Sequence, residues 1–167
     1  MLDYLAEPRP PVTAKVGSLG RHLRLDFASQ TWQGIEWKHT VVWVEPMVRA
    51  ADTVVLEITG GAPNPTDIRM AESTARGTGM PVAVLFQIPN QPLWGLSEDD
   101  LIAHTFEKAA TTGDASWPLL FPMVRSAIAA MDVLQAEGRK SGRPMERFVA
   151  TGASKRGWTT WLLGASG

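Results

Sequence analysis

The sequence contains no cysteine, which excludes disulfide bonds and thiolate metal sites. It also has no excess of charge: 16 Lys and Arg against 17 Asp and Glu give a formal net charge of -1, so no basic surface for nucleic acid is expected. No apolar run reaches the length of a membrane span, and the N-terminus lacks the basic start and apolar core of a signal peptide. What remains, 44% hydrophobic residues in 167, predicts one globular domain with a sizeable core.

The N-terminal part of the chain has the alternating pattern of half-buried strands. Residues 1–22, which include the proline-rich "EPRPP", are expected to form an extended lead-in. Strands are predicted over 23–29 and 35–46, with a turn near Gly34 that makes them an antiparallel pair.

From residue 52 onward, apolar runs rich in β-branched residues alternate with helical segments. Crossovers of this kind connect parallel strands, so we predict an α/β fold: a mostly parallel sheet, helices on both faces and an antiparallel N-terminal edge. Thr66 and Ser97 are the expected N-caps of the first two helices, and Gly138 is expected to end the third. Buried strands are predicted over 52–61, 80–89 and 146–152, and helices over 66–79, 96–114 and 117–138.

The stretch "FVATGASKRGWTTWL" (148–162) runs from a strand through a glycine-rich turn into a helix, a layout with three functional readings. A phosphate-binding loop would need a lysine where Trp158 stands, although Gly152 and Gly157 have the right spacing. A dinucleotide-binding turn would need glycines where Arg156 and Trp158 stand. Both readings therefore fit poorly, and neither a metal nor an organic cofactor is predicted.

The third reading is a nucleophile elbow, in which a serine is held on a sharp strand-to-helix turn between small residues. Ser154 follows Gly152 and Ala153 directly after the predicted strand, and Gly157 is one position later than in the usual G-x-S-x-G. The variant G-x-S-x-x-G occurs in α/β hydrolases such as glucuronoyl esterases, which also place a basic residue after the serine, as Lys155 is placed here. A structural turn without chemistry remains an alternative.

A double glycine earlier in the chain fits the same reading. An α/β hydrolase forms its oxyanion hole from the amide after the nucleophile and from an amide in the loop between an earlier strand and helix. The first of these is the amide of Lys155, and the second belongs to Gly60 or Gly61 in "TGG" (59–61). We therefore predict an oxyanion hole at these backbone amides.

Several segments together resemble the PhoPQ-activated pathogenicity-related proteins: "SQTWQGIEWKHTVVWVEP", "VVLEITGGAPN", "VAVLFQIPNQPL", "WPLLFPMVRSAIAAMD" and "ATGASKRGWTTWL". The resemblance implies an α/β-hydrolase-like fold with its nucleophile at Ser154, acting on a small-molecule or peptide substrate that the sequence does not identify. It implies that residues 23–167 are the N-terminal part of that domain, cut after the elbow helix begins. Members are commonly exported, which implies a periplasmic or extracellular protein.

The remaining members of a catalytic triad are not found where a hydrolase would have them. The triad order is serine, acid, histidine, yet the 13 residues after Ser154 contain neither an acid nor a histidine. Asp132 and the three histidines, His22, His39 and His104, all precede the serine. His39 is expected to be a structural residue on a strand, His104 to face solvent, and Asp132 to lie on a helix surface.

The chain alone is therefore expected to be inactive, and a serine hydrolase of ester or amide type is expected only of a complete protein that supplies the acid and the histidine. The alternative is a non-catalytic hydrolase-fold protein that binds a partner and is associated with a stress or virulence response. The sequence does not indicate an oligomeric state.

Overall fold

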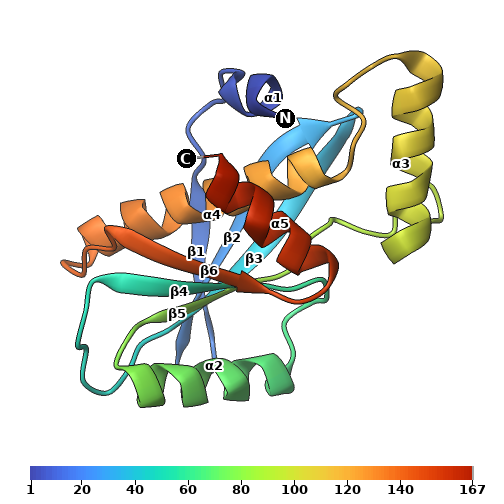
Figure 1. The fold of residues 1–167 in the computed structure, drawn as a ribbon. Helices are drawn as coiled ribbons and strands as arrows, with labels where there is room; N and C mark the ends of the chain where they lie inside the picture. Colours follow the sequence, from blue (N-terminus) through green and yellow to red (C-terminus); the bar gives the residue numbers. More distant parts are fainter. Residues whose placement is uncertain (167) are drawn as a thin grey trace.

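A computed structural model describes residues 1–166 and shows a six-stranded mixed sheet with helices on both faces (Figure 1). The strand order is β1-β2-β3-β5-β4-β6. The predicted α/β class and the order of elements after residue 22 are confirmed. The strands are β1 (Ala14–Leu19), β2 (His22–Trp32), β3 (Ile35–Val44), β4 (Thr53–Ile58), β5 (Val82–Leu85) and β6 (Arg147–Gly152); the helices are α1 (Leu2–Ala6), α2 (Pro65–Thr78), α3 (Glu98–Thr112), α4 (Leu120–Lys140) and α5 (Lys155–Ala165).

The antiparallel part of the sheet is larger than the sequence predicts. The hairpin of β2 and β3 turns at Gln33 and Gly34, which both have positive φ, as the tight two-residue turn requires. Strand β1 adds a further antiparallel strand, so residues 1–22 are not simply an extended lead-in but contain α1 and β1. Strand β3 also pairs antiparallel with β5.

Only β4, β5 and β6 run parallel, with β4 between the other two. Among the strands of residues 1–166, antiparallel pairings therefore outnumber parallel ones, and the prediction of a mostly parallel sheet is wrong. The reason is the short turns at the start of the chain, which can only join antiparallel strands, whereas each parallel connection needs a helix.

Two apolar layers fill the space between the sheet and its helices. On one face, α2 buries Ala71 and Ala75 against side chains of β3 and β5. On the other face, the largely buried helix α4 packs on the sheet beside α5 (Figure 1). Helix α3 stands to one side of the sheet (Figure 1), and its Phe106 ring stacks on Trp158 of α5 with centroids 6.3 Å apart.

The ends of several elements differ from the sequence prediction. The N-cap of α2 is Asn64, whose side chain accepts hydrogen bonds from the N–H groups of Thr66 and Asp67, so Thr66 is not the cap. Ser97 does occupy the N-cap position of α3, but its side chain makes no capping hydrogen bond. Helix α4 continues past Gly138 to Lys140.

The sequence predicts that 146–152 is a buried strand, and for β6 this prediction is wrong. Its residues alternate between exposed and half-buried, and Val149 is 51% exposed. The cause is its position: β6 pairs with β4 on one side and is the edge strand of the described sheet on the other.

Candidate functional site

The candidate site lies at the edge of the sheet where the three parallel strands have their carboxyl ends. Ile58, the last residue of β4, pairs with Gly152 of β6 and with Leu85 of β5, so the loops that follow these strands start side by side. From β4 the chain leaves to α2 on one face, and from β6 it leaves to α5 on the other (Figure 1). Open α/β sheets bind their ligands in the crevice at such a divergence.

Ser154 sits on the turn between β6 and α5 in a backbone conformation that side chains rarely adopt. Its φ is 53° and its ψ is -121°, and it is solvent-exposed. A non-glycine residue in this region carries strain of about 1–3 kcal/mol, which the surrounding structure has to hold. The serine that the sequence singles out is thus one of five non-glycine residues with positive φ within residues 1–166, and it is exposed.

Two glycines allow the turn to be this sharp. A Cβ at Gly152 would lie 2.7 Å from the carbonyl oxygen of Arg156, and a Cβ at Gly157 would lie 3.0 Å from the carbonyl oxygen of Gly152. The first turn of α5 therefore packs directly on the end of β6. Gly157 stands one position later than the second glycine of G-x-S-x-G. The contact explains this position, because Gly157 is the residue that faces Gly152.

The predicted oxyanion-hole residues lie on the loops that follow β4 and β6. Lys155 is the first residue of α5, and its N–H is one of the four at a helix start that have no partner within the helix. Gly60 and Gly61 follow β4, and the Gly61 carbonyl accepts a hydrogen bond of 3.0 Å from the N–H of Gln87. Gly61 is exposed and Gly60 is half-buried.

Arg156 connects these loops to one another. A Cβ at Gly60 would overlap the guanidinium group of Arg156, so the absence of a side chain at Gly60 makes room for it. The same guanidinium donates a 2.6 Å hydrogen bond from Nε to the carbonyl oxygen of Ile88, in the loop after β5. One side chain therefore holds together the ends of β4, β5 and β6.

The carboxylate of Glu98, the first residue of α3, accepts two hydrogen bonds from the Arg156 guanidinium, from Nη1 at 2.8 Å and from Nη2 at 2.7 Å. Lys155 Nζ lies 3.0 Å from the same carboxylate and 3.1 Å from Asp99, so its side chain is held at α3 and not free in solvent. The hydrogen bonds from Arg156, with those from Gln91 and Lys155, lower the pKa of Glu98 to about 2, and those to Glu98 and Asp99 raise the pKa of Lys155. This group, the Glu98 cluster, consists of Gln91, Glu98, Asp99, Lys155 and Arg156.

The sequence does not reveal the Glu98 cluster. Its acids, Glu98 and Asp99, stand in a run of acidic residues at a helix start, which the helix dipole already explains. Arg156 is notable in the sequence only as a departure from a glycine motif. Lys155 and Arg156 are two adjacent basic residues after Ser154, and this pair is the sequence signal for an ion-pair cluster. The sequence does not show the partner, because Glu98 lies 58 residues before Arg156 in the chain.

The histidines are engaged elsewhere. His39 is 2% exposed, and its ring contacts the Ser29 hydroxyl at 2.9 Å and the Gln87 carbonyl at 3.2 Å. Burial lowers its pKa to about 4, so the prediction of a structural residue on a strand is confirmed. His22 contacts the Glu72 carboxylate at 2.9 Å.

His104 and Asp132 also have structural surroundings. The His104 ring lies beside the neighbouring rings of Trp94 and Trp117, with centroids 5.7 and 6.5 Å away, so it packs against aromatic rings and does not simply face solvent. Asp132 is a surface residue, as predicted, and pairs with Arg9. Within residues 1–166, the Ser154 hydroxyl has no hydrogen bond to any histidine.

No helix between residues 1 and 166 is long and apolar enough to cross a membrane. Over the same residues, no three His, Asp or Glu side chains are grouped so that they could hold a metal ion.

The fold and the site define an α/β protein with a strained serine at the carboxyl edge of a mixed sheet. The chain matches the family described as PhoPQ-activated pathogenicity-related protein over residues 13–167, and it belongs to this family. It is also similar to the autocrine proliferation repressor protein A of Dictyostelium discoideum, with 35% identity over 158 residues. That match covers 84% of this chain but only 32% of the relative, so the chain spans about a third of the relative's length.

Proposed function

We propose that the complete protein is a serine hydrolase of ester or amide type, and that residues 23–167 are the N-terminal part of an α/β-hydrolase domain. The observation that carries the proposal is the backbone of Ser154, with φ 53° and ψ -121° at an exposed turn. Backbone strain of this kind clusters at functional sites, and here it presents the Ser154 side chain to solvent, which supports the proposal.

The arrangement supplies the nucleophile and the groups that would stabilise negative charge. Ser154 Oγ attacks the substrate carbonyl carbon, and the N–H of Lys155 donates a hydrogen bond to the oxyanion that forms. The second donor is the amide of Gly60 or Gly61, on the loop that Arg156 ties to the elbow. Preorganised donors of this kind act without rearrangement at the moment of reaction.

The base and its acid come from the part of the complete protein that follows residue 167. Serine is a weak nucleophile unless a base takes its proton. None of His22, His39 and His104 serves here, because each is held by the contacts described above. In the hydrolase order the acid and the histidine follow the serine along the chain, which agrees with the portion of the relative's length that this chain leaves unmatched.

A second candidate is a non-catalytic protein of the same fold that acts by binding a partner. It is favoured by the name of the relative, which describes a repressor of proliferation and no hydrolytic activity. In that case Ser154 would be retained as part of the turn only.

Turnover of p-nitrophenyl acetate by the complete protein separates the two candidates. We expect Ser154→Ala to lower kcat by about 10⁴-fold or more, the range found when a catalytic serine is removed. Ser73→Ala, at an exposed serine on α2, is the matched control and should leave kcat unchanged. Equal turnover by wild type and Ser154→Ala, or no turnover by wild type on esters of different chain length, would favour the binding protein.

A further inference from the structure

The loop that carries Gly60 and Gly61 is bound to the loop after β5 by two backbone hydrogen bonds. The N–H of Gln87 donates to the Gly61 carbonyl at 3.0 Å, and the N–H of Ile88 donates to the Thr59 carbonyl at 3.0 Å. Within residues 1–166, the amides of Gly60 and Gly61 themselves make no hydrogen bond to a backbone carbonyl. These two amides are the candidates for the second oxyanion donor, so their position depends on residues 87 and 88.

Gln87 has a backbone conformation that needs support from its surroundings. Its φ is 65°, in the left-handed region that a glutamine rarely adopts, and such a residue persists only where neighbouring groups fix it. The antiparallel pairing of β3 with β5 ends just before it, with the N–H of Phe86 bound to the Thr40 carbonyl at 2.9 Å. The next contact is made by a side chain: His39 Nδ1 lies 3.2 Å from the Gln87 carbonyl oxygen.

This contact decides which nitrogen of His39 carries the proton. Burial lowers the pKa of His39 to about 4, so at pH 7 the ring is neutral and has a single N–H. A carbonyl oxygen only accepts hydrogen bonds, so the N–H is at Nδ1 and Nε2 is an acceptor. Nε2 lies 2.9 Å from the Ser29 hydroxyl, which donates to it.

Ser29 is itself held by a buried network between β2 and α4. It is the extra residue of a β-bulge in β2, a feature that redirects a side chain, and it is 5% exposed. Its hydroxyl lies 2.9 Å from the Ser126 hydroxyl of α4, to which Gln30 Nε2 also donates at 3.0 Å. The His39 ring is therefore fixed on its Nε2 side, and its other nitrogen is directed at Gln87.

We propose that His39 is a positioning residue for the oxyanion hole: its Nδ1–H holds the Gln87 carbonyl, and Gln87 holds the loop with the two glycine amides. The inference rests on the proposed function, because it assigns these amides to an oxyanion. His39 acts through Gln87 and takes no part in proton transfer. Arg156 donates to the adjacent Ile88 carbonyl, so two consecutive carbonyls of this loop are each fixed by a largely buried side chain.

Two replacements of His39 separate its two contacts. His39→Asn places an amide N–H where Nδ1 stands and keeps the donor to Gln87, whereas His39→Gln places its amide where Nε2 stands and loses that donor. Both remove a buried ring, so the difference between them isolates the contact to Gln87. In hydrogen exchange of the complete protein, we expect the Gln87 and Ile88 amides to exchange about tenfold faster in His39→Gln, the effect of one lost hydrogen bond, and at nearly the wild-type rate in His39→Asn.

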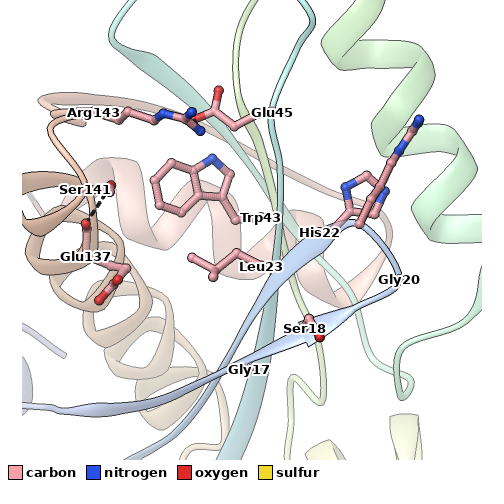
Figure 2. Close-up of a pocket in the computed structure, with 11 residues that line it drawn as sticks. Gly17, Ser18, Gly20, His22, Leu23, Trp43, Glu45, Glu137, Ser141 and Arg143 are labelled. Carbon is pink, nitrogen blue, oxygen red and sulfur yellow. Dashed lines mark hydrogen bonds and ion pairs between the residues drawn. The ribbon is translucent and has the colours of Figure 1, made fainter.

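Turnover of p-nitrophenyl acetate measures the consequence for the oxyanion hole. We expect His39→Gln to lower kcat by about 10²-fold, the cost of a misplacement of about 1 Å, and His39→Asn to retain most of it. KM should change little, because the oxyanion forms only in the transition state. His22→Gln is the matched control and should behave as wild type in both measurements: His22 is also buried, but it lies at the start of β2, in the pocket drawn in Figure 2.

The imidazole nitrogen shifts of wild-type His39 give a test that needs no folded variant, and we expect Nδ1 to be protonated and Nε2 not. The proposal is overturned if the proton is on Nε2, if the loop amides exchange equally in His39→Gln and His39→Asn, or if these variants have equal kcat while Ser154→Ala has lost turnover. A wild type without turnover would contradict the proposed function. The nitrogen shifts and the exchange rates would then decide whether His39 holds the loop.

Discussion

Replacing Glu98 by glutamine should destabilise the loops around Ser154, because this carboxylate is the common partner of two cations. It receives two hydrogen bonds from Arg156 and one ion pair from Lys155, and both basic side chains are largely buried, at 11% and 16% exposure. Glu98→Gln keeps the shape of the side chain but removes its charge. Arg156 and Lys155 then lie side by side with only Asp99 to compensate them.

The magnitude follows from the pKa of Glu98, which falls from 4.5 to about 2, chiefly through the hydrogen bonds from Arg156. At 1.36 kcal/mol for each tenfold change in proton affinity, this is about 3 kcal/mol as an upper bound. The side chain of Glu98 is 42% exposed, so solvent screens part of the interaction. We expect Glu98→Gln to lower the free energy of unfolding by about 1–2 kcal/mol at pH 7.

The pH dependence gives the sharper assay. Because the folded pKa is below the unfolded one, the contribution is fully present above pH 4.5 and is lost as the pH falls toward 2. Urea unfolding of the complete protein at pH 7 and pH 3 should therefore show a difference between wild type and variant that shrinks at pH 3. Glu107→Gln, at an exposed residue of the same helix, should change neither value. A Glu98→Gln variant as stable as Glu107→Gln at pH 7 would refute the reasoning.

Gly152→Ala should lower the free energy of unfolding by about 1–3 kcal/mol, because the new Cβ meets backbone atoms of Arg156. The control Gly17→Ala places its Cβ in open space and should lower the free energy of unfolding by less than about 0.5 kcal/mol; equal losses would contradict the packing of the turn. The His39 ring, whose pKa is about 4 because of burial, should stay neutral at pH 5 in an NMR titration, and a midpoint near 6.5 would contradict its burial. The isolated 167-residue chain should self-associate, as measured by analytical ultracentrifugation, through its exposed β6 edge and Trp161, which is 82% exposed. Trp161→Arg should reduce the self-association. A monomer that unfolds in one sharp transition would contradict the prediction.

The elements and the elbow could be predicted from the sequence because their signals are local. Strand and helix periodicity, the two-residue turn at Gly34 and the small residues around Ser154 act over a few positions. Local signals also explain why the N-cap of α2 was predicted two positions too late. Asn64 and Thr66 are both good capping residues, and only the backbone conformation decides between them. Gly138 was expected to end α4, but its role is to let the Arg143 carbonyl approach, where a Cβ would be 2.6 Å away.

Features that depend on neighbours distant in sequence could not be predicted in this way. The burial of β6 depends on which strands flank it, and its apolar sequence is the same at an edge as in the centre. The pairing of Arg156 with Glu98 and the fit of its guanidinium over Gly60 depend on the packing of α3 and α5 around the loops. The position of Ser154 on an exposed turn between a strand and a helix was therefore predictable, and the side chains that hold its surroundings were not.

The most direct test of the central proposal is to find which residue of the complete protein reacts with a fluorophosphonate probe. We predict that mass spectrometry of the labelled, digested protein places the adduct on Ser154, and that Ser154→Ala takes up no label while its thermal stability stays within about 1 kcal/mol of wild type, since an exposed hydroxyl contributes little packing. Label on a different serine, or undiminished labelling of Ser154→Ala, would contradict the assignment of Ser154 as the nucleophile.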